Sequence, residues 1–304
     1  MATQDQAVLT VEGASIAYGS VQALDGVSIT LRAGEILGFL GPNGAGKTSL
    51  IQSLAGRRTL DSGLIRCHLP GVYEDLIGVV PQEIAVYQDL TVLQNLNVFA
   101  SFQGIPKSHQ RAVVDEALQW AHLNEKRKTL AKSLSGGMQR RLNIACSVLH
   151  RPKILLLDEP TVGVDPQSRE RIYEMLQSLL EDGTSILLTT HHLEEAQDRC
   201  DRIAIIDQGK IVDCGTFEDL LTRTIGTAQL VRVSFTSPQQ RVPAPLRLTT
   251  SRMEATCEIQ DVSRQLPVLL SRVRAASLPM ENLSLRSPTL QHMFLHLTGK
   301  ELRE

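Results

Sequence analysis

Between residues 6 and 228, short apolar runs alternate with segments in which apolar residues recur every three or four positions. This alternation is typical of an α/β protein, so residues 1–228 are predicted to form one α/β unit. Some of the runs are apolar over nearly their whole length, as a parallel sheet covered on both faces requires; they lie at residues 35–40, 154–157, 185–189 and 203–206. Residues 8–11 and 27–31 are predicted to be edge strands.

The pattern becomes helical between residues 90 and 150. Apolar residues lie three and four positions apart in the segments 95–103, 110–121 and 137–149. Because these segments interrupt the alternation of strands, they are predicted to form a helical subdomain, at about residues 85–150, inserted into the α/β core.

The remaining residues, 229–304, differ in charge from the rest of the chain. This segment carries a net charge of +4, whereas residues 1–228 carry −6. Residues 230–235 and 255–259 have the pattern of strands, and residues 289–298 have that of a helix preceded by Ser-Pro. The segment is predicted to be a small α+β accessory domain, and its positive charge is interpreted as a solvated surface.

The composition excludes several classes of protein. The 304 residues include 42% hydrophobic and 21% charged residues and carry a formal net charge of −2, which is typical of a globular protein. No apolar run approaches the roughly 20 residues that a membrane-spanning helix needs, and the N-terminus shows no secretory signal. The cysteines form no CxxC pair, so we expect reduced thiols in a cytoplasmic protein. The near-neutral charge and 4% aromatic content argue against a nucleic-acid partner.

The strongest local signal is the segment GPNGAGKT at residues 41–48, which follows a predicted buried strand and opens a predicted helix. Glycines let backbone N–H groups turn inward around phosphates, and the start of the helix adds a partial positive charge. Lys47 is expected to reach the β- and γ-phosphates, and the Thr48 hydroxyl to bind Mg²⁺. The candidate nucleotide-binding residues here are Gly41, Pro42, Asn43, Gly44, Ala45, Gly46, Lys47, Thr48 and Ser49.

A second element for catalysis is the run ILLLDE at residues 154–159, where an apolar strand ends in two carboxylates. Asp158 can hold Mg²⁺ beside the phosphate loop, and Glu159 can orient and deprotonate a water that attacks the γ-phosphorus. Neighbouring carboxylates point in different directions, which suits one metal ligand and one general base.

A second phosphate-binding helix start is predicted at LSGGMQ, residues 134–139. Ser135, Gly136 and Gly137 open an amphipathic helix there, and we refer to these three residues as the signature segment. The chain already has one such site, so a second one makes sense if it covers the nucleotide that another copy holds.

These motifs, in this order, resemble the nucleotide-binding subunit of ATP-binding cassette (ABC) transporters over residues 6 to about 228. The resemblance implies a P-loop NTPase core of the RecA-like type with an antiparallel β subdomain and an inserted helical subdomain, and an ATPase that uses ATP and Mg²⁺. It also implies a role for Tyr18 in stacking on adenine, for Gln82 in contacting Mg²⁺ and the attacking water, for Asp165 in linking two sites across a dimer, and for His191 in contacting the γ-phosphate. The implied catalytic residues are Lys47, Gln82, Glu159 and His191, and the implied metal-binding residues are Thr48, Gln82 and Asp158.

The resemblance also implies partners. We expect a second cassette subunit that is an identical copy, together with separate transmembrane permease subunits, at the inner face of the plasma membrane. Met138 stands where many members have Gln, a variant that resembles the drug and antibiotic exporter branch. The alternatives are a soluble ABC ATPase that acts on a non-membrane partner and a regulatory cassette without turnover. A plain edge-strand aromatic and a turn residue are the alternative interpretations of Tyr18 and Gln82.

Overall fold

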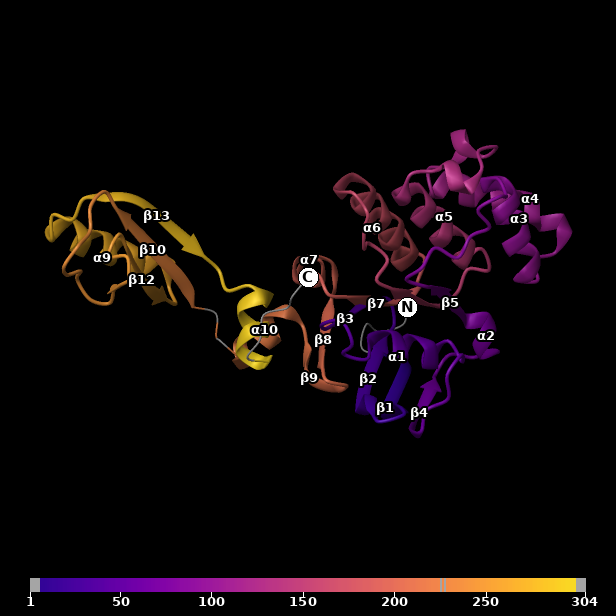
Figure 1. The fold of residues 1–304 in the computed structure, drawn as a ribbon, viewed down its shortest axis with the longest axis horizontal. Helices are drawn as coiled ribbons and strands as arrows, with labels where there is room; N and C mark the ends of the chain where they lie inside the picture. The colour runs from indigo at the N-terminus through magenta and orange to yellow at the C-terminus, as the bar shows by residue number, and fades with distance from the viewer. Residues whose placement is uncertain (1–5, 225, 227, 299–304) are drawn as a thin grey trace. The chain divides into compact units, whose positions relative to one another are not determined.

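The computed structural model describes residues 6–224, 226 and 228–298 (Figure 1). The chain divides into two compact units, and the division falls between Cys214 and Gly215. The sequence placed a domain boundary further along, after residue 228. The division comes earlier because α8 (Phe217–Thr224) packs against α10 (Leu290–Thr298) within the second unit.

The first unit contains a six-stranded sheet with the strand order β5-β6-β7-β3-β8-β9. Every residue of β3, β6 and β7 is buried, which confirms the strands predicted from continuous apolar runs. Neighbouring strands from β5 to β8 pair in parallel, so their carboxyl ends lie along one edge of the sheet. The strands are β3 (Ile36–Leu40), β5 (Ile77–Val80), β6 (Ile154–Asp158), β7 (Ser185–Thr190), β8 (Arg202–Asp207) and β9 (Lys210–Gly215).

A separate antiparallel sheet has the order β2-β1-β4, formed by β2 (Val21–Arg32), β1 (Ala7–Tyr18) and β4 (Ser62–Cys67). The prediction that residues 8–11 lie in an edge strand is wrong, because β1 pairs with β2 on one side and with β4 on the other. No residue of β4 is fully buried, so its pattern gave no sign of this second pairing. A continuous apolar core joins this sheet to the six-stranded sheet and to α1 (Lys47–Leu54).

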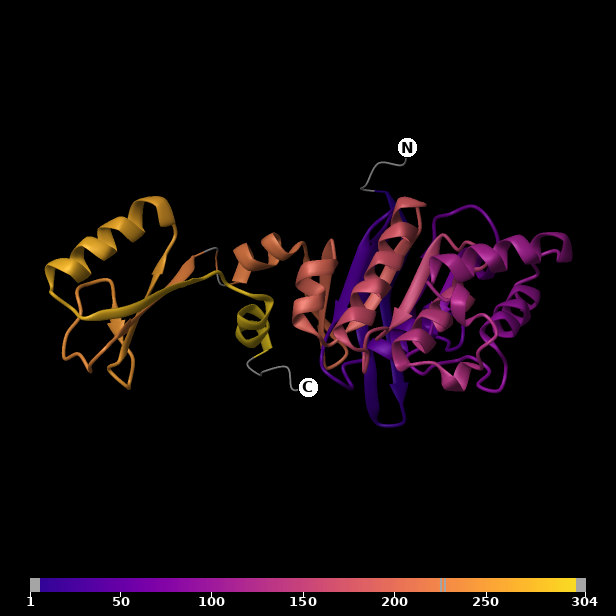
Figure 2. The ribbon, with the colours of Figure 1, turned by 90° about the horizontal axis from the view of Figure 1, so that it is seen from above.

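The helical subdomain contains α3 (Val92–Phe102), α4 (Lys107–Trp120) and α5 (Gly136–Val148), which confirms the predicted helices. Both views show these helices gathered on the side of the unit away from β1, β2 and β4 (Figures 1 and 2). A second apolar core joins them to α6 (Pro166–Glu181) and to one face of the six-stranded sheet. Shorter elements complete the unit: α2 (Tyr73–Leu76), η1 (Asn124–Lys126), η2 (Ala131–Ser133) and α7 (Leu193–Arg199).

The second unit is an α+β fold. Its antiparallel sheet has the order β11-β12-β10-β13, formed by β10 (Gln229–Phe235), β11 (Arg247–Leu248), β12 (Glu254–Ile259) and β13 (Met280–Arg286). Alternate residues of β10 and β12 are buried, and Leu269 and Val273 of α9 (Val262–Ala275) join them in one apolar core. The predicted strands at residues 230–235 and 255–259 are present, whereas α9 and β13 were not predicted.

Candidate functional site

The loop between β3 and α1 passes so close to neighbouring backbone that only glycine fits at two positions. A Cβ atom on Gly41 would lie 2.3 Å from the carbonyl oxygen of Ile206, and one on Gly46 would lie 2.2 Å from that of Ala23. Gly46 also has a φ of 109°, in the left-handed region that favours glycine. The loop therefore forms a tight turn, the phosphate cradle of the prediction, in which these two positions have no room for a side chain.

The first turn of α1 is arranged to receive an anion. No side chain caps this turn, and it contains no acidic residue. The backbone N–H groups at the start of a helix have no partner within the helix and carry a partial positive charge. Thr48 is exposed at this helix start. The donor set fits the phosphates of a nucleotide.

The ammonium group of Lys47 lies at the edge of this cradle. The residue is only 5% exposed, and Nζ donates to the carbonyl oxygens of Gly41 at 2.8 Å and of Pro42 at 3.2 Å. Nζ also lies 3.1 Å from Oε1 of Glu159. These oxygen contacts fix the ammonium between the loop and the carboxylates that end β6.

The two carboxylates at the end of β6 have different surroundings. The Thr189 hydroxyl on the neighbouring strand β7 donates to Oδ1 of Asp158 at 2.6 Å and accepts from the backbone N–H of Glu159 at 3.0 Å. Glu159 has a φ of 47°, a conformation that non-glycine residues rarely adopt. Asp158 is thus held against β7, whereas Glu159 turns toward Lys47. This difference fits the two roles expected from the sequence.

Glu159 is the meeting point of the predicted catalytic residues. His191 Nδ1 lies 3.2 Å from its Oε1, and Gln82 Nε2 donates to its Oε2 at 3.5 Å. Burial alone would raise the pKa of Glu159, but the charge of Lys47 and hydrogen bonds from His191 and Lys47 outweigh burial and place the pKa below its ordinary value. The carboxylate is therefore ionised at neutral pH, the form that a general base needs.

The loop that carries Gln82 is held by a residue that the sequence analysis missed. Arg140 is 4% exposed, and its guanidinium donates to the carbonyl oxygens of Pro81 at 2.9 Å and of Gln82 at 2.5 Å. The signal in the sequence was a charged residue on the buried side of the helix that follows the signature segment, because a buried arginine needs acceptors. Arg140 connects that helix to the Gln82 loop.

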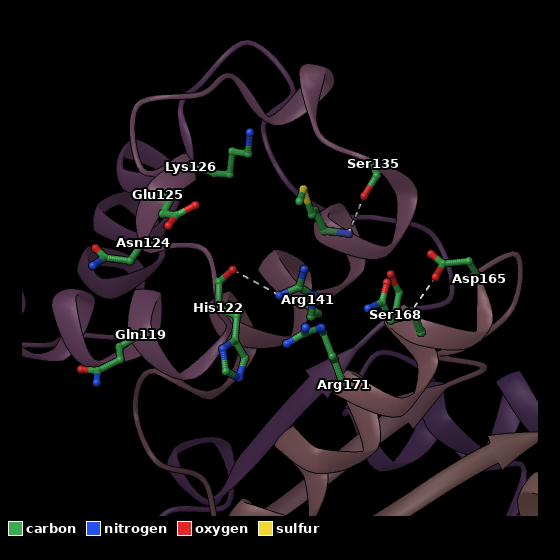
Figure 3. A pocket seen from close by; sticks show the side chains of 12 residues that line it. Gln119, His122, Asn124, Glu125, Lys126, Ser135, Arg141, Asp165, Ser168 and Arg171 are labelled. Carbon is green, nitrogen blue, oxygen red and sulfur yellow. Dashed lines mark hydrogen bonds between the residues drawn. The ribbon is translucent and has the colours of Figure 1, made fainter.

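The signature segment lies at a different place from the phosphate loop. Ser135 and Asp165 line a cavity that includes none of residues 41–49 (Figure 3). Gly136 is exposed, and a Cβ on it would meet no atom within 4 Å, whereas a Cβ on Gly137 would lie 2.2 Å from Oγ of Ser168 in α6. Within this chain, the signature segment is therefore positioned by α6 and open toward the outside.

Tyr18 also lies outside the cluster around Glu159. Its side chain is 45% exposed at the end of β1, and the guanidinium carbon of Arg58 lies 5.1 Å from the centre of its ring. The contact is that of a cation–π pair. One face of the ring is therefore covered by a cation.

Comparison with known proteins identifies the family. The sequence model described as ABC transporter matches residues 24–162. The chain is 35% identical to the linearmycin resistance ATP-binding protein LnrL of Bacillus subtilis, over 98% of this chain and 100% of that protein. It is 37% identical to the Nod factor export ATP-binding protein I of Ralstonia nicotianae, over 98% and 95% of the two chains. The chain belongs to the ABC transporter family, and it is an ATPase.

Solved structures agree with this assignment. The structure of an ATP-binding subunit of an ABC transporter superposes with a TM-score of 0.65 at 26% identity, over 71% of this chain and 92% of that chain. The structure of cbiO1 from Clostridium perfringens, part of the ABC transporter complex cbiONQ, gives a TM-score of 0.65 at 28% identity, over 71% and 91%. These neighbours confirm the P-loop NTPase core. No helix in the described part of the chain is long and apolar enough to cross a membrane.

Proposed function

We propose that this chain is the ATP-hydrolysing subunit of an exporter, in which two identical copies close around ATP and drive separate transmembrane subunits. The observation that carries this proposal is the exposed signature segment, which opens outward and shares no cavity with the phosphate loop of its own chain. A second copy can approach Gly136 without displacing any side chain. The names of the relatives support export, since they refer to linearmycin resistance and to Nod factor export.

The catalytic step follows from the surroundings of Glu159. Its ionised carboxylate accepts the proton of a water that attacks the γ-phosphorus, and Gln82 and His191 fix the orientation of that carboxylate. Lys47 is close enough to the loop to stabilise negative charge on the phosphates. Tyr18, with its exposed ring, stacks on the adenine.

A magnesium site fits the same edge of the sheet. Thr48, Gln82 and Asp158 supply oxygen atoms, the donors that Mg²⁺ prefers. When bound, Mg²⁺ neutralises charge on the phosphates and helps to align them. Thr189 keeps the Asp158 carboxylate in place for this purpose through its hydrogen bond to Oδ1.

The two-copy arrangement converts ATP binding into movement. The γ-phosphate held by one copy gathers the Ser135 hydroxyl and the Gly137 N–H of the other, and Asp165 connects the two sites. A ligand that contacts both copies only in the closed state favours that state, so hydrolysis lets the dimer open. The membrane subunits dock along residues 82–96 at the inner face of the plasma membrane. Exposed rings of Tyr87 and Phe102 near this segment support such a contact.

A mixing experiment tests whether the site is shared. Lys47→Ala damages the phosphate loop of a copy, and Ser135→Arg blocks its signature segment. Each variant alone should be inactive, but a mixed dimer contains one intact phosphate loop facing one intact signature segment. Equal mixing should therefore restore ATPase activity to about a quarter of the wild-type rate.

The control is the same total concentration of each variant measured alone. If folded variants show no recovery on mixing, the shared site is refuted. Reconstitution with the transmembrane subunits in vesicles then tests export, measured as ATP-dependent movement of linearmycin or of a Nod factor across the bilayer.

A further inference from the structure

A cavity in the first unit lies away from the phosphate loop, since none of residues 41–49 lines it. It has a volume of about 770 Å³ and is enclosed by the end of α4, by η1, and by the first turns of α5 and α6 (Figure 3). Its size is in the range of sites that hold a small metabolite, roughly 300–1,000 Å³. The lining is mostly polar and charged, which is unusual for a gap left by imperfect packing of a core.

Arg141 lies at the centre of this cavity. The residue is 5% exposed, and Nη1 donates to the carbonyl oxygens of Ala121 and His122, which end α4 (Figure 3). Its buried Nε has no hydrogen-bond partner. Nη1 therefore holds the guanidinium at the end of α4, and an anion in the cavity would offset the cost of burying its charge.

A second guanidinium faces the same space. Arg171 of α6 is half-buried and lines the cavity beside Arg141 (Figure 3). Burial lowers the pKa of Arg141, and the like charge of Arg171 lowers it further, while Asp165 acts in the opposite direction. Two arginines are thus held close together although they repel each other.

The two carboxylates in the cavity, Glu125 and Asp165, act on this pair of arginines only at a distance. Asp165 uses Oδ1 to accept the backbone N–H of Ser168 at 3.0 Å, which caps α6. Within the described ranges, neither Asp165 nor Glu125 forms an ion pair with Arg141 or Arg171. Lys126 adds a third cation to the lining, so the cavity has an excess of positive charge.

We propose that this cavity is a second anion site, which binds a phosphate group between Arg141 and Arg171. The planar fork of a guanidinium matches the oxygen atoms of phosphate, and two arginines can supply paired hydrogen bonds from two sides. The rest of the cavity has room for a small body attached to the phosphate, with amide groups of Gln119, Asn124 and Gln167 on its walls. A phosphate here ties α5, in the helical subdomain, to α6, in the core.

Titration of the full-length protein tests this site. The phosphate loop is first filled with saturating ADP, and inorganic phosphate is then added in a calorimeter. Arg171→Gln should weaken phosphate binding at least tenfold, because one fork is lost. The control is Arg111→Gln on the exposed face of α4, with a side chain that is 95% exposed, and it should bind as the wild type does.

Two further measurements separate the possible sources of the signal. Lys47→Ala removes a phosphate ligand of the catalytic site, so binding to the cavity should persist in this variant. Ribose 5-phosphate in place of inorganic phosphate shows whether the site takes a free anion or a phosphomonoester. Equal binding by wild type and Arg171→Gln, no binding in the wild type, or loss of binding in Lys47→Ala would each overturn the proposal.

Discussion

The two helix starts that the sequence marks as phosphate-binding are built in opposite ways. The start of α1 has no side-chain cap and follows Gly46, a buried glycine in the left-handed region. The start of α5 is exposed, and the Ser135 side chain caps it by accepting from the N–H of Met138 at 3.3 Å. The first leaves its backbone N–H groups without a side-chain partner and suits an anion that is held within one chain. The second is a stable, outward-facing surface suited to a ligand that arrives already bound to another molecule.

The largest expected effect is a loss of turnover at Glu159, which contacts Lys47 at the start of α1. Glu159→Gln keeps the size and shape of the side chain but removes its charge and therefore the base. ATP binding should persist, and the turnover number should fall on the order of 10²–10⁴-fold. Measuring both the ATPase rate and nucleotide affinity checks this. Glu174→Gln on the exposed face of α6 is the control, and a similar rate in both variants would remove Glu159 from the role of base.

Gly136 and Gly137, at the start of α5, should differ in how one added methyl group changes stability and turnover. Gly136→Ala has free space, so stability should change by less than about 0.5 kcal/mol, while turnover should fall about 10- to 100-fold because the methyl displaces the partner's phosphate. Gly137→Ala forces α5 away from Ser168 and should cost about 1–3 kcal/mol of stability. Denaturant unfolding and ATPase assays measure both. If Gly136→Ala is fully active, the exposed start is not part of the site.

Arg140 connects α5, the helix that the signature segment opens, to the loop that carries Gln82. That loop contacts Glu159 through Gln82. Arg140→Met keeps a long side chain but leaves the carbonyl oxygens of Pro81 and Gln82 without this donor. The free energy of unfolding should fall by about 1–3 kcal/mol, and the turnover number should fall while nucleotide affinity stays. Arg111→Met is the exposed control. Equal loss of affinity and turnover would mean that Arg140 only supports the fold.

The smallest expected effect is on how the free energy of unfolding depends on pH. The pKa of Glu159 lies below its ordinary value because Lys47 and His191 favour the charged form over the opposing effect of burial. The stability from this carboxylate is therefore present above the unfolded pKa of about 4.3 and is lost as pH falls through the lower folded pKa. Unfolding measured from pH 3 to 7 should show a smaller acid-induced loss in Glu159→Gln. The same slope in both proteins would contradict this.

The sequence predicted the parts of the fold and site that depend on neighbouring residues. Continuous apolar runs located β3, β6 and β7, and the GPNGAGKT and ILLLDE segments placed Lys47 and Glu159 after the carboxyl ends of β3 and β6, which lie on either side of β7. These predictions succeed because a buried parallel sheet brings the carboxyl ends of its strands together.

What the sequence did not predict depends on pairing between distant segments. The central position of β1 follows from its contact with β4, and the hydrogen bond from Thr189 to Asp158 follows from which strand lies beside β6. The position of Arg140 on the buried side of α5 indicates that it needs acceptors, but not that these lie on the Gln82 loop. Such contacts join residues 31–59 positions apart, and no local pattern encodes them.

The 3.1 Å contact between Lys47 and Glu159 links two events that could have been independent. In the proposed mechanism, an incoming γ-phosphate competes for the same ammonium, and its arrival would separate Lys47 from Glu159. Binding of the nucleotide and release of Glu159 from Lys47 would then occur in a single step. On this proposal, Glu159 stays paired with Lys47 in the absence of ATP and becomes available as a base only when ATP is bound.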